Sequence, residues 1–141
     1  MSNFSVTKKK IEGHTTYHLK DAREKMTFSI VPDIGNWGYS LTAKGHEVFY
    51  PRPSFAQYLA ERGLGYGNPL MAPFANRIDR DYYYFEGRKY LLNGDLGNFL
   101  RTPPKNFPIH GVMAYDPRWE VVKTSASDSA GKMSIISPRT R

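Results

Sequence analysis

The 141-residue sequence contains no cysteine. This absence excludes a disulfide framework, a thiolate zinc site and a cysteine nucleophile. No apolar run approaches the ~18 residues needed to span a bilayer, so we expect no membrane partner. The opening stretch, MSNFSVTKKK, lacks the apolar segment of a secretory signal, and a reducing cytoplasmic location is the expected compartment.

Acidic residues are scarce: 13 stand against 20 basic ones, and the net charge is +7. Such an excess can bind polyanions, because basic side chains neutralise phosphates. Six basic residues lie near the two ends with no acid beside them: Lys8, Lys9, Lys10, Lys132, Arg139 and Arg141. Residues 11–131 are nearly neutral. The pattern favours solvated ends, with residues 1–14 as a basic N-terminal arm, over a nucleic-acid partner, and leaves a polyanion-binding basic domain as an alternative.

Strand-like alternation of apolar and polar residues dominates the first third of the chain. It runs through four segments separated by short polar or glycine-bearing turns, at residues 15–19, 26–32, 39–43 and 47–50. Such spacing predicts a meander of antiparallel hairpins. Further strands are indicated in a hairpin around Gly87 and at residues 119–123 and 133–136. Residues 15–141 are therefore expected to form one all-β domain.

One short helix interrupts this pattern. Ser54 is a suitable N-cap, Gly63 ends the segment, and residues 55–62 place Phe55, Tyr58 and Leu59 on one face. Residues 93–108, by contrast, carry glycine, asparagine and proline and are expected to be a long loop of the kind that builds a site.

Four histidines are present, and no pair of them has the metal-ligand spacing His-x-x-x-His on a helix with a carboxylate, so no metal site is expected. His14, His18 and His46 lie in predicted hairpins or turns, where an imidazole is usually a satisfied polar group. His110 differs, because it lies at the exit of the long loop, directly before Gly111. This position favours an imidazole that faces a cleft and a glycine that lets a ligand approach; the alternative is a histidine that pins the loop by hydrogen bonding.

Arg77 follows an apolar run and has Asn76 beside it. A planar guanidinium and an amide together offer donors and an acceptor that can grip adjacent sugar hydroxyls or a carboxylate. The alternative is a buried arginine bonded to backbone carbonyls at a sheet edge. For the aromatic stretch at residues 82–85, packing in the core is favoured over stacking on sugars or bases.

Several motifs occur in a consistent order: Gly67-Asn68-Pro69, then Pro73-Phe74-Ala75-Asn76-Arg77-Ile78, then Phe85-Glu86-Gly87-Arg88-Lys89-Tyr90-Leu91-Leu92-Asn93, then His110-Gly111 and a strand that opens with Trp119. Together they resemble the aldose 1-epimerase (galactose mutarotase) family over about residues 15 to 123.

The resemblance implies an antiparallel β-supersandwich and a free aldohexose whose α and β anomers interconvert by acid/base ring opening, with no cofactor or metal. Asn76 and Arg77 would contact sugar hydroxyls. His110 would bind substrate near the ring and serve as a catalytic residue that supports proton transfer.

The chain also departs from this family, whose members are about twice as long. Their second histidine and their glutamate base come from a part without counterpart here. The acids after His110, namely Asp116, Glu120 and Asp128, do not stand in the glutamate's context. We therefore expect an incomplete supersandwich, the N-terminal half, that ends within what should be sheet and is inactive alone. Its uncovered sheet edges would favour self-association, and a non-catalytic sugar-binding or interaction relic is the alternative function.

Overall fold

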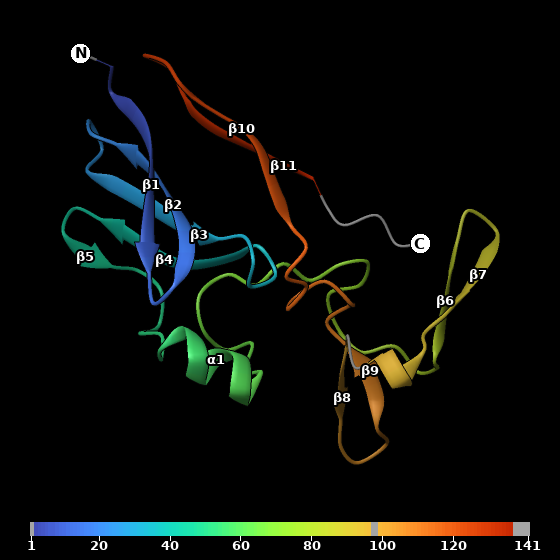
Figure 1. Cartoon of the computed structure of the whole chain (residues 1–141). Coiled ribbons are helices and arrows are strands. Elements are labelled where there is room, and N and C mark those ends of the chain that lie inside the picture. Colours follow the sequence, from blue (N-terminus) through green and yellow to red (C-terminus); the bar gives the residue numbers. More distant parts are fainter. Residues whose placement is uncertain (1, 97–98, 137–141) are drawn as a thin grey trace.

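The computed structural model describes residues 2–96 and 99–136, and antiparallel strands dominate it (Figure 1). The largest element is a five-stranded sheet in the order β1-β2-β3-β4-β5. Its strands are β1 (Phe4–Ile11), β2 (His14–Asp21), β3 (Met26–Val31), β4 (Trp37–Ala43) and β5 (His46–Glu47). Each strand pairs antiparallel with its neighbour in sequence. The predicted meander and the all-β class are confirmed, although β5 is shorter than the expected residues 47–50.

The basic N-terminal segment forms the edge strand β1. It pairs with β2 along its whole length, from Phe4 opposite Asp21 to Ile11 opposite His14. Lys8, Lys9 and Lys10 stay exposed on this strand. The segment expected as an arm therefore belongs to the sheet, and its exposed lysines are typical of an edge strand.

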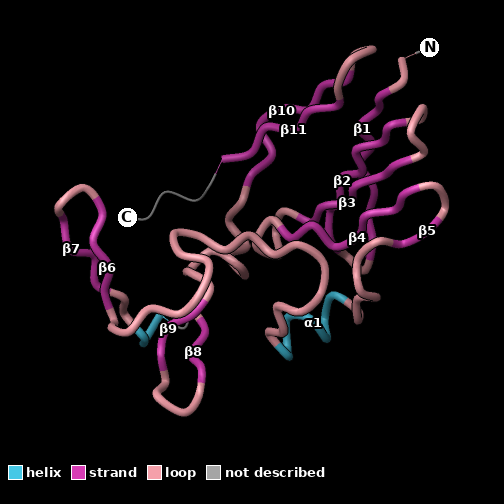
Figure 2. The backbone as a smooth tube through the Cα atoms, turned by 180° about the vertical axis from the view of Figure 1, so that it is seen from behind, coloured by secondary structure: helices cyan, strands magenta, loops and turns pink. Residues whose placement is uncertain are grey.

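The described residues also contain three two-stranded antiparallel sheets and one 3-10 turn, η1 (Gly94–Leu96). The pairs are β6 (Tyr82–Phe85) with β7 (Arg88–Leu91), β8 (Leu100–Thr102) with β9 (Phe107–Ile109), and β10 (Glu120–Ala126) with β11 (Gly131–Ile136). The hairpin around Gly87 and the last two strands are thus confirmed. The β8–β9 hairpin lies where a long loop was expected. Figure 2 shows β6–β7 and β8–β9 at the end of the molecule away from the five-stranded sheet.

The predicted helix is confirmed as α1 (Phe55–Glu61). The Ser54 hydroxyl accepts a hydrogen bond from the backbone N–H of Gln57 at 3.1 Å, and Arg62 ends the helix in a left-handed conformation. Phe55 and Tyr58 are buried as expected, whereas Leu59 remains 37% exposed.

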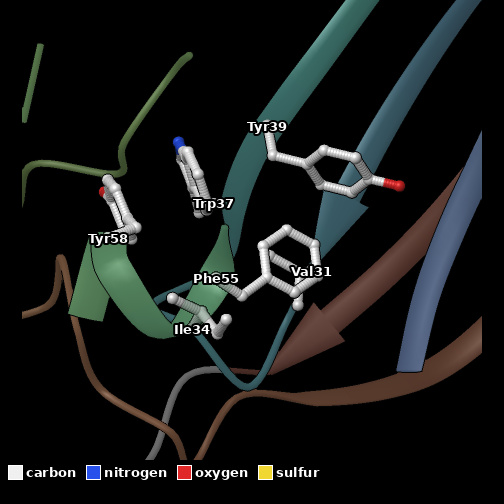
Figure 3. Close-up of a cluster of buried hydrophobic side chains, with 6 residues drawn as sticks. All are labelled: Val31, Ile34, Trp37, Tyr39, Phe55 and Tyr58. Carbon is white, nitrogen blue, oxygen red and sulfur yellow. The ribbon is translucent and has the colours of Figure 1, made fainter. Parts of the chain in front are cut away.

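A cluster of buried side chains joins α1 to the end of the sheet (Figure 3). Its members are Val31, Ile34, Trp37, Tyr39, Phe55 and Tyr58. The Trp37 and Tyr58 rings stack with centroids 3.6 Å apart and planes 3° apart. The Trp37 indole N–H also donates to the carbonyl of Tyr66 at 2.9 Å, so the loop after α1 is held against the core.

The β10–β11 hairpin lies against β1 and β2. The Ser2 hydroxyl donates to the carbonyl of Ser127 at 2.6 Å and links the two parts of the chain. The expected ending within the sheet, at residues 137–141, lies outside the described residues. In the described part of the chain, no helix has the length and apolar character needed to cross a membrane.

Candidate functional site

Two segments that are distant in sequence run side by side and bring the candidate residues together. Arg77 and Ile109 form an antiparallel bridge. The backbone N–H of Ile78 donates to the carbonyl of Pro108 at 3.1 Å, and that of His110 donates to the carbonyl of Asn76 at 3.4 Å. The backbones of Asn76, Arg77 and His110 are therefore adjacent.

The His110 ring is anchored by one of its two nitrogens. Nδ1 lies 2.8 Å from the backbone carbonyl oxygen of Ala75. A carbonyl only accepts, so Nδ1 carries the proton, and Nε2 of the neutral ring is left as the acceptor. The loop-pinning role considered for this histidine is thus present at Nδ1, and it leaves Nε2 for a ligand.

Gly111 serves packing, and the expectation that it lets a ligand approach is wrong. A Cβ built at this position would lie 2.0 Å from the carbonyl oxygen of Ala72, and the φ angle of Gly111 is 71°. The neighbouring Val112 N–H donates to the same carbonyl at 2.8 Å. The Ala72 backbone therefore fills the space that a side chain at position 111 would need.

Arg77 is exposed, so the alternative of a buried arginine bonded to backbone carbonyls is wrong. Its Nε donates to the Thr102 hydroxyl at 3.1 Å. The Asn76 side chain turns to the backbone, because its Oδ1 accepts the Arg77 N–H at 2.8 Å. The guanidinium thus reaches across to β8, while one acceptor of Asn76 is used locally.

A pocket of about 310 Å³ lies between the end of α1 and the β8–β9 hairpin. It is lined by Glu61, Arg62, Leu64, Leu100, Arg101, Thr102, Ile109 and His110. His110 is therefore part of the pocket wall, and Arg77 contacts that wall through Thr102. Asn76 adjoins His110 through the backbone and does not line the pocket. The volume is at the lower end of that of small-molecule sites, about 300–1,000 Å³.

Charged groups on this wall are held by neighbours. Arg101 makes a two-bond pair with Asp81 at 2.9 and 3.0 Å, and these hydrogen bonds hold the pKa of Asp81 below its ordinary value. The Arg62 guanidinium lies 5.4 Å from the ring centroid of Tyr115. Glu61 Oε1 accepts from the Gln57 amide at 2.6 Å. The pocket thus combines fixed donors and acceptors with the apolar side chains of Leu64, Leu100 and Ile109.

Sequence reasoning missed Glu61, Arg101 and Thr102 as members of this wall. Arg101 and Thr102 could have been identified from the sequence, because they lie within residues 93–108, the segment expected to build a site. Glu61 had no local signal, since it is the last residue of an ordinary amphipathic helix.

The other histidines are satisfied or exposed, as expected. His14 Nδ1 lies 3.0 Å from Asp33 Oδ2. His18 contacts the hydroxyls of Thr16 and Ser29 at 3.1 and 3.0 Å, and burial lowers its pKa. His46 is exposed at the start of β5. Across residues 2–96 and 99–136, no three or more histidine and acidic side chains gather in a way that could hold a metal ion.

The aromatic stretch at residues 82–85 contributes no side chain to the buried core, contrary to the expectation, although Tyr82 and Tyr83 are half-buried. Tyr84 and Phe85 are 65% and 60% exposed. The β6–β7 hairpin projects away from the five-stranded sheet (Figure 1). Tyr83 and Tyr90 stack on each other within the hairpin, with centroids 5.2 Å apart.

Comparison with known proteins leaves the family of this chain open. No protein-family model matches the sequence, and no curated protein matches it either.

Proposed function

We propose that this chain is a mutarotase-like carbohydrate-binding protein that holds a free aldohexose in the pocket beside His110. The observation that carries the proposal is the anchored imidazole. Because Nδ1 is bonded to Ala75, the ring has a defined orientation, and Nε2 can meet a hydroxyl of a ligand in the pocket.

The composition of the pocket wall supports a sugar. Hydroxyl, guanidinium, carboxylate and imidazole groups can pair with several hydroxyls at once. Apolar side chains on the same wall suit the C–H faces of a pyranose ring. Arg77 lies outside the pocket and orients the Thr102 hydroxyl on its wall. In this proposal Arg77 supports sugar binding through Thr102, in addition to the direct contact with sugar hydroxyls that the resemblance implies.

The antiparallel meander supports a relationship to the β-supersandwich. In this proposal the five-stranded sheet is the opening sheet of that fold, and the chain is its N-terminal half. Unpaired sheet edges would then favour self-association.

Isothermal titration with glucose and galactose tests the function. A ligand of 12 heavy atoms at about 0.3 kcal/mol per atom gives roughly 4 kcal/mol, which corresponds to a Kd of about 1 mM. Thr102→Val and Arg77→Ala should each weaken binding about fivefold. The first removes a hydroxyl of the pocket wall, the second removes the hydrogen bond that orients this hydroxyl, and one such bond contributes about 1 kcal/mol. Arg88→Ala, on β7 and outside the pocket wall, is the matched control. Absence of measurable heat with both sugars at concentrations well above 1 mM would exclude the proposal.

A further inference from the structure

A second cavity lies at the β6–β7 hairpin and shares no lining residue with the pocket beside His110. Its volume is about 420 Å³, within the range of small-molecule sites. The hairpin lies at the end of the molecule away from the five-stranded sheet (Figure 2). The cavity wall consists of aromatic side chains and one proline, namely Pro73, Phe74, Tyr83, Tyr84, Phe85 and Tyr90. The aromatic stretch that is absent from the core therefore lines a separate candidate site.

The rings of this cavity are ordered against one another and remain accessible. Tyr83 and Tyr90 lie opposite each other in the hairpin, and their rings stack with centroids 5.2 Å apart and planes 11° apart. The Phe74 ring lies 6.1 Å from the Tyr83 ring, between centroids. Tyr90 is 39% exposed and Phe85 is 60% exposed. The cavity thus presents flat aromatic surfaces on which another planar ring can stack.

A cation lies on the same face of the hairpin as these rings. Residues directly opposite each other in an antiparallel pair share a face, as do residues two apart on one strand. Arg88 is opposite Phe85, and Phe85 is two residues from Tyr83, so Arg88 lies on the face of the cavity rings. Within residues 2–96 and 99–136, the exposed Arg88 guanidinium has no hydrogen bond, ion pair or ring contact. It can therefore pair with an anionic group of a ligand.

The other charged side chains of the hairpin are placed differently. Lys89 follows Arg88 on the strand and so lies on the opposite face, where its Nζ is 3.8 Å from the ring centroid of Tyr82. Arg80 donates to the Tyr82 hydroxyl at 2.6 Å. Glu86 belongs to the turn, and neither it nor Tyr82 lines the cavity. Arg88 is thus the charged group that the cavity face of the hairpin offers.

We propose that this cavity binds a nucleoside monophosphate, with the base stacked on the cavity rings and the phosphate paired with Arg88. A planar base suits a wall of aromatic rings, and the phosphate complements the charge of the unpaired guanidinium. A pyranose suits this wall less well, because its many hydroxyls need several polar partners and the wall offers only those of tyrosine. The proposal is independent of aldohexose binding, since it concerns another cavity.

Titration calorimetry with adenosine 5′-monophosphate, adenosine and inorganic phosphate tests the role of Arg88. The monophosphate should bind with a Kd of about 1 mM or lower. Adenosine should bind about tenfold more weakly, because it lacks the charge-assisted pair. Inorganic phosphate should give no measurable heat, since one exposed arginine holds an anion weakly. Arg88→Ala should weaken the monophosphate about tenfold and leave adenosine within about twofold. Lys89→Ala, on the opposite face, is the matched control and should leave both within about twofold.

The same titrations test stacking. Phe85→Ala should weaken both the monophosphate and adenosine about tenfold, the scale of one base stacked on an aromatic ring. Leu91→Ala is the matched control, because Leu91 is 75% exposed on the same hairpin and does not line the cavity. Circular dichroism of each variant verifies that the strands remain intact.

Several outcomes would overturn the proposal. The first is a wild-type chain that does not bind the monophosphate at concentrations well above 1 mM. Equal affinity for the monophosphate and adenosine would remove the pairing of Arg88 with phosphate. Unchanged nucleotide binding in Phe85→Ala would place the ligand outside this cavity. Binding of oligoadenylate without binding of the monophosphate would identify a surface for single-stranded nucleic acid instead. Absence of glucose binding beside His110 would contradict the proposed function and leave these results unaffected.

Discussion

His110 Nδ1 lies 2.8 Å from the carbonyl oxygen of Ala75, and this contact joins the segment after β9 to the strand-like segment that carries Arg77. The same contact sets the tautomer of the ring, because the carbonyl oxygen can only accept a hydrogen bond and Nδ1 must therefore carry the proton. The chemistry proposed for the pocket depends on this assignment, since it leaves Nε2 toward the ligand.

The first prediction concerns this tautomer. When the imidazole ring of His110 is neutral, its single N–H proton should be on Nδ1. Long-range ¹H–¹⁵N correlation spectra of labelled protein distinguish the two tautomers, and His110→Asn identifies the signals. A ring protonated on Nε2 would contradict the observed contact and deprive the pocket of its imidazole acceptor.

The second prediction concerns Gly111. Gly111→Ala should lower the free energy of unfolding by about 3 kcal/mol, because the new Cβ would collide with the Ala72 backbone at a positive φ. Gly45→Ala is a matched comparison, since Gly45 also has a positive φ of 87° and has nothing within 4 Å of an added Cβ. It should cost only about 1 kcal/mol. Urea unfolding measures both, and equal losses would disprove the packing role of Gly111.

The third prediction concerns the pH dependence of stability around His18. Burial lowers the pKa of His18 from its ordinary 6.5, so the folded protein favours the neutral ring. Below pH 6.5 the unfolded chain binds this proton first, and stability should fall as the pH drops toward the lowered pKa. Above pH 6.5 the His18 ring is neutral in both the folded and the unfolded chain, so it no longer makes stability depend on pH.

Urea unfolding at a series of pH values between 5 and 8 measures this effect at about 0.5-unit intervals. His18→Asn should flatten the slope below pH 6.5, whereas His46→Asn, at an exposed position, should leave it unchanged. An unaltered slope in the His18 variant would show that another group carries the acid sensitivity.

The fourth prediction concerns Glu12, which lies in the turn between β1 and β2 and contacts the start of α1. Its carboxylate accepts the backbone N–H of Phe55, and this hydrogen bond lowers the pKa of Glu12. It also pairs with Arg52 at 2.9 Å. Glu12→Gln should lower the free energy of unfolding at pH 7 by about 1 kcal/mol, since the charge-assisted bond to the first helical N–H is lost.

The sign of the pH effect follows from the direction of that shift. The stabilisation by Glu12 is complete above pH 4.5 and is lost as the pH falls through the lowered pKa. Wild-type and Glu12→Gln unfolding curves should therefore converge in acid. Glu24→Gln, whose side chain is exposed on the β2–β3 turn, supplies the baseline, and an equal loss in that variant would contradict a specific role for Glu12.

Elements defined by neighbouring residues could be predicted from the sequence. The alternation in residues 26–32 and 39–43 specified β3 and β4, because strand side chains alternate between two faces. Ser54 marked the start of α1, because its hydroxyl satisfies a helix N–H. Two elements were not predicted from the local sequence. The segment of β1 contains three consecutive lysines and was interpreted as a basic arm, and the segment of β8 and β9 contains glycine and proline and was interpreted as a loop.

The candidate site depended on contacts between distant segments. The sequence by itself determined the antiparallel meander and the helix. It also identified Arg77 and His110 as candidate site residues, because residue type and immediate neighbours can be read directly from the sequence. Only the tertiary structure decided that Arg77 lies opposite Ile109, that Gly111 packs on Ala72, and that Glu61 shares a pocket with His110. Backbone pairing and close packing between distant segments create these relationships, and no local pattern of residues encodes them.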